Sequence, residues 1–408
     1  MTSHTDRVEP GEAGTSRPLW RKLAESWASS CTHGQVTLVF PDGDAVVFKG
    51  TEPGPAATMR LHNGKPVWKM ISRGDLGFAE AYMDDDWSTP DLTALVEFGV
   101  RNENALAGRL TASWLVRLVS SMQFRLRANS RSGAKRNIAF HYDLGNAFYR
   151  AWLDETMTYS SALFASDRLS LSAAQEAKYR RIIETLDIGP NDRVLEIGCG
   201  WGGFAELTAR ETGAQLTCLT ISKEQARFAT ERMAAANVSD RVEIRLEDYR
   251  DTRGDYDKIV SIEMFEAVGE ENWPVFFDVV RERLTEHGRA LLQIITVPDD
   301  RFATYRKRVD FIQRYIFPGG MLPSPRALSD AIANAKLELA DRLSFGQSYA
   351  ETLRQWNERF QEAWESIRPL GFDERFRRMW TYYLNSCEGC FRTGATDVGQ
   401  FLIDKRRA

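Results

Sequence analysis

The feature that most constrains this chain is an apolar run that ends in a cluster of glycines. Residues 193–197 read Arg-Val-Leu-Glu-Ile, a pattern typical of a buried strand. A turn without side chains directly after a strand lets a nucleotide-sized ligand press against the backbone. The sequence therefore predicts a nucleotide site at this turn. The glycines concerned are Gly198, Gly200, Gly202 and Gly203.

The spacing of these glycines also fits a dinucleotide-binding fingerprint. That fingerprint normally has an acidic residue about 20 residues further on, at the end of the next strand. Here the next apolar run, residues 215–222, ends in threonine and serine. The acidic residue is instead Glu196, which precedes the first glycine. This placement suits a single nucleoside with a charged tail, such as S-adenosylmethionine (SAM), better than a pyrophosphate.

Strand-like and helix-like segments alternate in the second half of the chain. Such alternation predicts an α/β fold with a mostly parallel, doubly wound sheet, which is Rossmann-like with helical insertions. Ligands of such sheets bind at the carboxyl ends of the strands. The predicted strands are 193–197, 215–220, 242–246, 258–262 and 290–296, and the predicted helices include 204–212 and 223–237.

The chain has 408 residues, which is enough for two domains. Residues 1–17 are polar and are predicted to form a disordered tail. Residues 18–128 are predicted to form a small α+β domain with an accessory role in lipid interaction. This domain is expected to contain a helix over 19–30 and a hairpin around 41–44, where the sequence reads Pro-Asp-Gly-Asp. Residues 129–408 are predicted to form the catalytic domain.

One segment, residues 104–142, contains no acidic residue. Apolar residues recur every four positions from Leu106 to Leu126, which predicts an amphipathic helix. Its basic face fits an interfacial segment that lies against anionic lipid headgroups. The alternative is a linker helix whose basic face is only solvated, and both interpretations stay open. The basic residues are Arg109, Arg117, Arg125, Arg127, Arg131, Lys135 and Arg136.

Composition argues against several functional classes. A formal net charge of -4 at pH 7 disfavours a general nucleic-acid binder. No apolar run approaches the roughly 20 residues that a membrane-spanning helix needs. The cysteines and histidines show neither a disulfide framework nor metal-ligand spacing, so we expect no metal site. A cytoplasmic protein is the expectation from these features.

Polar residues that follow the other strands are candidates for binding the cofactor. Thr220 and Gln225 follow the second strand and are predicted to bind the ribose and amino-acid groups of SAM. Asp248 follows the third strand and is predicted to accept a hydrogen bond from the adenine amino group, with Tyr249 beside the ring. A helix N-cap is the alternative for Asp248. Glu196 and the glycines complete the predicted cofactor site.

Two carboxylates, Glu263 and Glu266, directly follow the apolar strand at 258–262. An acid in this position needs a partner, because burying it unpaired is costly. Glu266 is the stronger candidate for a catalytic group. For each carboxylate the alternative is capping a helix or pairing with an arginine.

Seven short blocks occur in order along residues 137–400. They are His141-Tyr-Asp-Leu-Gly-Asn146, Thr158-Tyr-Ser-Ser161, Glu196-Ile-Gly-Cys-Gly-Trp-Gly-Gly203, Thr220-Ile-Ser-Lys-Glu-Gln225, Met264-Phe-Glu-Ala-Val-Gly269, Tyr315-Ile-Phe-Pro-Gly-Gly320 and Tyr382-Tyr-Leu-Asn-Ser-Cys387. Together they resemble the cyclopropane-fatty-acyl-phospholipid synthase family, which includes the mycolic acid cyclopropane synthases. The resemblance implies SAM-dependent methyl transfer to the double bond of an unsaturated phospholipid acyl chain, which forms a cyclopropane. It also adds Tyr159 and Ser160 to the predicted cofactor site.

The chemistry that the resemblance implies explains the residue types. An alkene is a weak nucleophile, so the methyl group must be held in line and near contact with it. Transfer leaves a carbocation that aromatic faces can stabilise, and ordinary core packing is the alternative role for such rings. The candidates are Tyr142, Tyr159, Tyr315 and Phe317.

A base must then take a proton from the new methyl group so that the ring closes. The resemblance implies that this base is a bound bicarbonate ion. Glu266 is the strongest candidate in the implied pocket, because its carboxylate can hold the protonated ion or receive its proton. The pocket residues are Ser161, Glu266, Gln293, Ile295 and Tyr349.

Several positions depart from the resemblance. Many bacterial members have histidine where this chain has Ala267 and Gln293, and glutamine donates a hydrogen bond but does not titrate. A methyl-branched, methylene or methyl-alkene product therefore stays open beside the cyclopropane. Ser161 replaces the usual cysteine, which matters little if the contact comes from the backbone. Cys387 matches a position often marked as active, and a helix-core cysteine is the alternative.

The resemblance also implies the surroundings of the protein. The expected substrate is an unsaturated phospholipid in a membrane surface, so peripheral association with the inner face of the membrane is expected. Bacterial relatives suggest a homodimer. A non-catalytic lipid-binding or SAM-binding module is the rival from another class, and the intact Glu266 and glycine turn argue against it.

Overall fold

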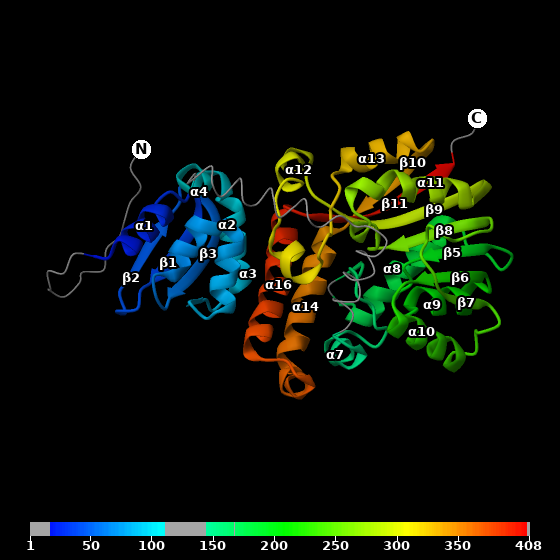
Figure 1. The fold of residues 1–408 in the computed structure, drawn as a ribbon, viewed down its shortest axis with the longest axis horizontal. Coiled ribbons are helices and arrows are strands. Elements are labelled where there is room, and N and C mark those ends of the chain that lie inside the picture. The colour runs from blue at the N-terminus through cyan, green and yellow to red at the C-terminus, as the bar shows by residue number, and fades with distance from the viewer. Residues whose placement is uncertain (1–16, 111–143, 167, 406–408) are drawn as a thin grey trace. The chain divides into compact units, whose positions relative to one another are not determined.

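The structure, a computed structural model, describes residues 17–110, 144–166 and 168–405. The chain forms two compact units (Figure 1). The first comprises Met1–Phe124, Arg308–Phe311 and Arg368–Ala395, and the second Arg125–Lys307, Ile312–Ile367 and Thr396–Ala408. The predicted domain boundary at 128–129 and most of the basic segment 104–142 lie outside the described residues.

A four-stranded sheet of order β2-β1-β3-β4 forms the base of the first unit. β1 (His33–Val39) pairs antiparallel with β2 (Ala45–Lys49) and parallel with β3 (Glu52–Leu61). The predicted hairpin is confirmed, since Val39 lies opposite Ala45 and Gly43 has a φ of 89° in the turn. The other elements are α1 (Leu19–Ala28), α2 (Lys65–Met83), β4 (Trp87–Ser88), α3 (Leu92–Arg101), α4 (Glu103–Leu110) and α16 (Glu374–Thr393).

Helix α16 belongs to this first unit although it is distant from it in sequence. The hydroxyl of Thr93 on α3 donates to Asn385 Oδ1 at 2.9 Å and to Glu388 Oε2 at 3.0 Å on α16. A Cβ at Gly389 would lie 2.8 Å from Val96 Cγ1, so glycine is what allows these helices to approach so closely. The C-terminal part of the chain therefore contributes a helix to the N-terminal unit.

The second unit contains a seven-stranded sheet of order β10-β11-β9-β8-β5-β6-β7. Five neighbouring strands, from β9 to the edge strand β7, pair in parallel, which confirms the predicted α/β fold. These are β5 (Arg193–Ile197), β6 (Gln215–Thr220), β7 (Val242–Leu246), β8 (Tyr256–Ile262) and β9 (Leu284–Thr296). β10 (Leu337–Ser344) and β11 (Asp397–Lys405) extend the sheet with antiparallel pairing.

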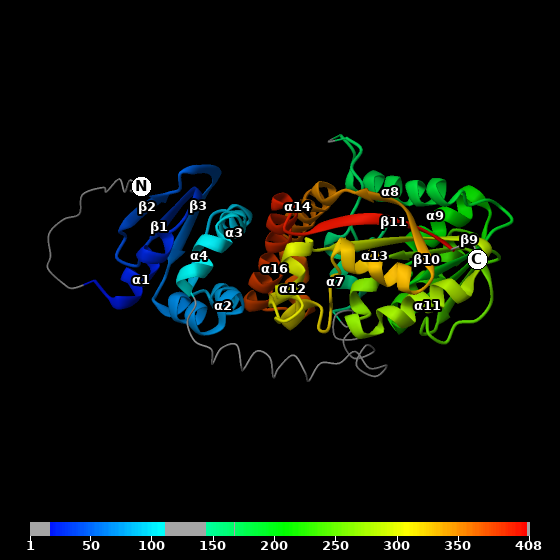
Figure 2. The same ribbon diagram turned by 90° about the horizontal axis from the view of Figure 1, so that it is seen from above.

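Helices cover both faces of this sheet (Figure 1, Figure 2). Alternate strand residues point to opposite faces. Leu195 packs on the face covered by α11 (Trp273–Arg283) and α13 (Pro325–Asn334). Val194 packs on the other face, beneath α8 (Leu171–Leu186) and α9 (Gly203–Thr212), and α10 (Lys223–Ala235) also lies there. β5 is consequently buried on both sides from Val194 to Ile197, which explains its almost continuous apolar sequence.

The order of the strands also places the expected ligand site. β5 lies between β6 and β8, where the chain reverses its direction of travel across the sheet. In such sheets the ligand crevice lies at the carboxyl ends of the strands beside this reversal. The remaining elements are α7 (Asn146–Trp152), η1 (Phe265–Ala267), η2 (Glu270–Asn272), α12 (Asp299–Tyr305), η3 (Ile312–Ile316), α14 (Gly346–Glu362), α15 (Trp364–Ile367) and η4 (Arg368–Leu370). None of the helices described has the length and apolar character needed to cross a membrane.

Candidate active site

The glycine turn connects β5 to α9 and presents bare backbone. Gly198, Gly200 and Gly202 have φ values of 85°, 54° and 82°, a region that other residues enter only with strain. The N–H groups of Gly198 and Cys199 donate to the Leu219 carbonyl of β6 at 3.0 and 2.9 Å, which fixes the turn. A Cβ at Gly200 would meet no atom within 4 Å. Open space beside a fixed glycine backbone fits the close approach of SAM.

Alanine at Gly198 and at Gly200 should separate folding from ligand binding. Both substitutions force a side chain to a positive φ, which costs about 1–2 kcal/mol. At Gly198 the new Cβ would also lie 2.7 Å from Met264 Cγ, so Gly198→Ala should show the larger loss of thermal stability. At Gly200 the methyl group would enter the open space, so Gly200→Ala should weaken binding of S-adenosylhomocysteine roughly tenfold or more. Calorimetry and thermal unfolding measure both effects, and equal stability losses with unchanged affinity would contradict this assignment.

A buried lysine stands at the centre of several carboxylates. Lys178 on α8 is 0% exposed, and its Nζ donates to Ser160 Oγ at 2.7 Å. Burial lowers the pKa of this ammonium group, and the negative charges of Glu263, Asp154 and Glu196 oppose that effect. Ser160, predicted to bind the cofactor, is thus positioned by Lys178.

Lys178 is absent from the site predicted from the sequence, although its position in the sequence indicates a buried charge. The buried face of α8 also includes Ala174, Ile182 and Leu186 at helical spacing. A lysine within such an apolar stripe indicates a buried charge that needs partners. Gln175 supplies a second partner, since its Oε1 accepts from Lys178 Nζ at 2.7 Å.

Glu196, also predicted to bind the cofactor, is 3% exposed on β5. Loss of hydration raises the pKa of this carboxyl group to about 7, against the attraction of Lys178. Its Oε2 is buried and has no hydrogen-bond partner among the described residues. A buried carboxylate oxygen left without a donor at the end of β5 fits a hydrogen bond from a ligand.

The cofactor candidates after β6 and β7 bind partners within the protein. Thr220 Oγ1 donates to Gln225 Oε1 at 2.9 Å, so the structure brings this predicted pair together. Asp248 forms a two-pronged ion pair with Arg250, with oxygen–nitrogen distances of 2.8 and 2.6 Å. It also accepts from the Arg250 N–H at 3.1 Å, so it stabilises a turn and caps no helix. The ring of Tyr249 packs against the core on the α11 face of the sheet.

Glu263 directly follows β8 and lies in a network of donors. Its Oε1 accepts from the Ser161 N–H and from Gln293 Nε2, both at 2.8 Å, and its Oε2 accepts from the Tyr349 hydroxyl at 2.7 Å. Burial raises the pKa of Glu263, and the Tyr349 hydrogen bond and the charge of Lys178 oppose the rise. Within the described part of the chain, Glu263 neither caps a helix nor pairs with an arginine.

A polar chain fixes the orientation of the Gln293 amide. Gln400 Nε2 donates to Gln293 Oε1 at 3.1 Å, and Arg181 Nη1 donates to Gln400 Oε1 at 2.5 Å. Since Oε1 of Gln293 is thereby an acceptor, its NH2 group faces Glu263. Gln293 is therefore a fixed donor to a carboxylate in this chain.

Glu266 lies in η1 and is held differently. Its Oε1 accepts from the Ile295 N–H at 2.6 Å, while its Oε2 is buried without a partner among the described residues. Loss of hydration, and then the negative charge of Glu263, raise the pKa of Glu266 to about 8. Near pH 7 this carboxyl group is neutral. Burial thus raises the pKa of both carboxyl groups, and perturbed pKa values of this kind are typical of acid–base sites.

The five residues predicted to hold bicarbonate do come together, but around a carboxylate of the protein. Three of them donate to Glu263, and a fourth, Ile295, donates to the fifth, Glu266. The donors expected for the ion are already paired, so the pocket does not fit bicarbonate beside Glu263. Ser161 contributes its backbone N–H, which serine and cysteine share.

Aromatic rings gather beside these carboxylates. The ring centre of Tyr159 lies 5.2 Å from Trp356, 5.6 Å from Trp152 and 6.3 Å from Phe317. Trp356 also lies 6.1 Å from Tyr349, which donates to Glu263. Trp356, on the same helix as Tyr349, is absent from the site predicted from the sequence. This aromatic group is suited to stabilise a positive charge.

Three other predicted residues have different surroundings. Tyr142 lies outside the described residues. Tyr315 lies in η3, with the guanidinium carbon of Arg314 5.6 Å from its ring centre. Cys387 lies on α16 of the first unit, where burial raises the pKa of its thiol well above the ordinary value. A thiol that stays protonated is a weak nucleophile, which favours a structural cysteine.

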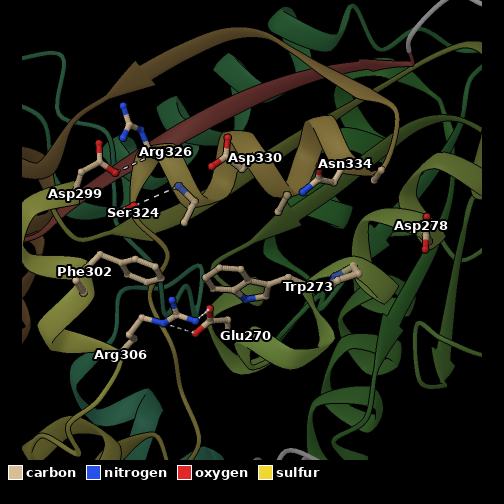
Figure 3. A pocket seen from close by; sticks show the side chains of 15 residues that line it. Glu270, Trp273, Asp278, Asp299, Phe302, Arg306, Ser324, Arg326, Asp330 and Asn334 are labelled. Carbon is tan, nitrogen blue, oxygen red and sulfur yellow. Dashed lines mark hydrogen bonds and ion pairs between the residues drawn. The ribbon is translucent and has the colours of Figure 1, made fainter.

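A pocket of about 550 Å³ lies among α11, α12 and α13 (Figure 3). The rings of Trp273 and Phe302 lie nearly parallel with centres 6.3 Å apart, and Arg306 pairs with Glu270 in its wall. The residues that line it include none of the predicted site residues. The glycine turn and the two carboxylates, and not this pocket, therefore form the candidate active site.

Comparisons with known proteins identify the family of this chain. Residues 129–401 match the family described as mycolic acid cyclopropane synthetase. The tuberculostearic acid methyltransferase of Mycobacterium tuberculosis is 40% identical over 384 residues, covering 92% of this chain and 88% of that protein. The cyclopropane-fatty-acyl-phospholipid synthase of Escherichia coli K12 is 35% identical over 367 residues, covering 88% and 90%.

Solved structures of cyclopropane synthases are also similar to this chain. A cyclopropane synthase from Mycobacterium tuberculosis has a TM-score of 0.63 at 30% identity, covering 66% of this chain and 98% of that one. A mycolic acid cyclopropane synthase complexed with SAH (S-adenosylhomocysteine) and CTAB also has a TM-score of 0.63, at 31% identity and the same coverage. By sequence, fold and the extent of both matches, this chain is an enzyme that belongs to the mycolic acid cyclopropane synthetase family of SAM-dependent lipid-modifying enzymes.

Proposed function

We propose that the enzyme transfers the methyl group of SAM to the double bond of an unsaturated phospholipid acyl chain and forms a cyclopropane fatty acyl chain. One observation carries the proposal. A glycine turn after β5 and two carboxyl groups with raised pKa values after β8 lie at the ends of neighbouring strands. The names of the relatives support a lipid substrate, and so does the CTAB in one of their structures.

SAM would be held by residues around the glycine turn. When bound, it supplies an electrophilic methyl group. The bare backbone at Gly200 would admit its methionine part, and the free Oε2 of Glu196 would accept a hydrogen bond from it. The other proposed contacts come from Tyr159, Ser160, Gly198, Gly202, Thr220, Gln225, Asp248 and Tyr249.

On the lipid side, the aromatic group would face the charge that develops on the acyl chain. Methyl transfer leaves a positive carbon, which the faces of Tyr159 and Trp356 would stabilise. Trp356 and Trp152 are fully buried, so their rings would also exclude the water that would otherwise react with the cation. Glu266 is neutral near pH 7 and offers a hydrogen-bond donor at its unpartnered oxygen.

A methylene, methyl-alkene or methyl-branched chain is a second candidate product of the same methyl transfer. Gln293 stands where a titratable histidine is common in the resembling family, and it acts here as a fixed donor. The 40% identity with a tuberculostearic acid methyltransferase favours this alternative as well. Both products arise from the same site and differ only in how the cation is resolved.

The phospholipid substrate leads us to propose that the enzyme works at the inner face of the membrane as a peripheral protein. The basic segment 104–142, predicted to lie against anionic headgroups, is mostly outside the described residues, so its role rests on sequence. A homodimer remains a prediction from the family resemblance.

Product analysis tests the proposed function. Purified enzyme is incubated with SAM and liposomes of monounsaturated phospholipid, and the released fatty esters are examined by mass spectrometry. We expect a gain of one methylene unit with these liposomes and no gain with a saturated phospholipid. Ring-opening derivatisation then separates a cyclopropane from a methylene or methyl-alkene. No gain in an enzyme that still binds S-adenosylhomocysteine would reject the proposal and favour a non-catalytic binding module.

A further inference from the structure

The carboxylate of Glu263 stands where the family resemblance places bicarbonate. We propose that Glu263 is the base that takes the proton from the newly added methyl group, so that this enzyme needs no bicarbonate. The inference rests on the proposed function and names the proton acceptor within the same site. It also shifts the catalytic role away from Glu266, the residue favoured by the sequence.

The contacts of Glu263 are those of a built anion site. Two N–H donors bind its Oε1 and one hydroxyl binds its Oε2, at 2.7–2.8 Å. The donors come from a backbone, an amide held by Gln400, and α14, so each is fixed by a different element. An ionised carboxylate has about four acceptor positions, which leaves one for a proton.

The backbone of Glu263 is also held in a strained conformation. Its φ is 49°, a region where glycine is free of strain and other residues incur a cost of about 1–3 kcal/mol. The Glu263 N–H donates to the Gln293 carbonyl at 2.8 Å, and the side-chain contacts hold the other end. Strain of this kind persists only where the surrounding structure imposes it, and it concentrates at active sites. A glutamate at a position suited to glycine indicates that its side chain has a function.

The surrounding charges suit a proton acceptor. Burial lowers the pKa of the fully buried Lys178 to about 7, and its ammonium form would balance an ionised Glu263. Glu266 stays neutral near pH 7 and so adds no second negative charge. The three donors and Lys178 oppose the rise in the pKa of Glu263 that burial causes, and a carboxylate in surroundings that disfavour charge is a stronger base than one in water.

The reaction needs one proton acceptor and no further reactant. The alkene π electrons bond to the methyl carbon, and the electron pair of the broken carbon–sulfur bond stays on sulfur. The neighbouring alkene carbon becomes positive. Glu263 Oε2 then takes a proton from the added methyl group, and the released C–H electron pair bonds to the positive carbon and closes the ring. If a hydrogen first shifts from the methyl-bearing carbon, the same proton loss gives a methylene chain.

Two variants of Glu263 test the proposal by chemical rescue. Glu263→Gly removes the base, relieves the backbone strain and vacates a pocket lined by the same three donors. Glu263→Gln also removes the base but keeps the pocket filled. In bicarbonate-free buffer we expect both to lose roughly 10²–10⁴-fold in product formation. Added bicarbonate or formate should restore at least part of the activity of Glu263→Gly and none of that of Glu263→Gln.

Two controls distinguish a loss of folding from a loss of catalysis. Binding of S-adenosylhomocysteine, measured by calorimetry, reports whether each variant retains the folded site. Glu338→Gln, an exposed carboxylate on β10, should leave activity unchanged. If Glu263→Gly does not fold, the activities of the wild type and of Glu263→Gln in bicarbonate-free buffer decide whether Glu263 is the base.

The outcomes separate two kinds of failure. Full wild-type activity without bicarbonate, combined with inactive Glu263→Gln, supports Glu263 as the base. Wild-type activity that depends on added bicarbonate overturns this inference and leaves the proposed function intact, and so does an active Glu263→Gln. A wild-type enzyme that modifies no unsaturated lipid under either condition overturns the proposed function itself.

Discussion

Lys178→Met is expected to lower the free energy of unfolding by about 3–5 kcal/mol, because removing one partner from a buried charge cluster leaves the others uncompensated. Lys178 is 0% exposed, and three carboxylates, Glu263, Asp154 and Glu196, lie within its electrostatic influence. Methionine has a similar length and leaves little cavity, so the loss reports charge and not packing. Urea unfolding at pH 7 measures it as a lower midpoint.

The same substitution should also abolish most activity. Without the ammonium charge, burial favours the protonated form of Glu263, which is no longer a base. The hydrogen bond that positions Ser160 is lost as well. Lys223→Met, at an exposed position at the start of α10, is the matched control and should change stability by no more than about 0.5 kcal/mol. If Lys178→Met were as stable as this control, the carboxylates around it would not be ionised.

Glu266→Gln is expected to raise the free energy of unfolding, whereas Lys178→Met lowers it. The pKa of Glu266 rises from 4.5 to about 8 in the folded protein, so the folded state keeps a proton that the unfolded chain releases. The stability that the protonated Glu266 contributes is full below pH 4.5. It is lost as pH rises to 8, by at most about 1.4 kcal/mol per pH unit. Glutamine has no proton to lose. Glu266→Gln should therefore gain stability over the wild type as pH is raised from 5 to 8.

Activity distinguishes the two carboxylates. Glutamine at position 266 keeps a neutral side chain that accepts from the Ile295 N–H, so we expect Glu266→Gln to retain activity within about tenfold of the wild type at pH 7. The wild type should lose activity above pH 8 as Glu266 ionises beside Glu263, and the variant should lack this decline. An inactive Glu266→Gln combined with an active Glu263→Gln would make Glu266 the base.

The parallel core of the sheet could be predicted from sequence, because strands buried on both faces are continuously apolar. The predicted strands 193–197, 215–220 and 242–246 match β5, β6 and β7 in both bounds. β10 has no such signal, since most of its residues are exposed and its pairing with β11 is irregular at Leu339–Asp341. The place of α16 in the first unit follows from tertiary contacts such as Thr93–Asn385, which no local pattern reveals.

The residues of the pocket could be predicted from the sequence, but the carboxylate to which they donate could not. The resemblance identified Ser161, Gln293 and Tyr349 as one pocket, and the structure brings them together. The sequence could show that an acid after β8 needs partners, but not which ones. Ser161 and Tyr349 are 102 and 86 positions from Glu263 along the chain. Only the fold shows that their donors meet on this carboxylate.

The mass of the acyl chains formed by the wild-type enzyme in bicarbonate-free buffer tests the central claim most directly. The enzyme, SAM and monounsaturated phospholipid liposomes are mixed in buffer sparged with nitrogen, and a parallel reaction receives bicarbonate. We predict a gain of one methylene unit at equal rates in both reactions. A gain that appears only with bicarbonate would contradict Glu263 as the base, and no gain in either reaction would contradict methyl transfer to the lipid.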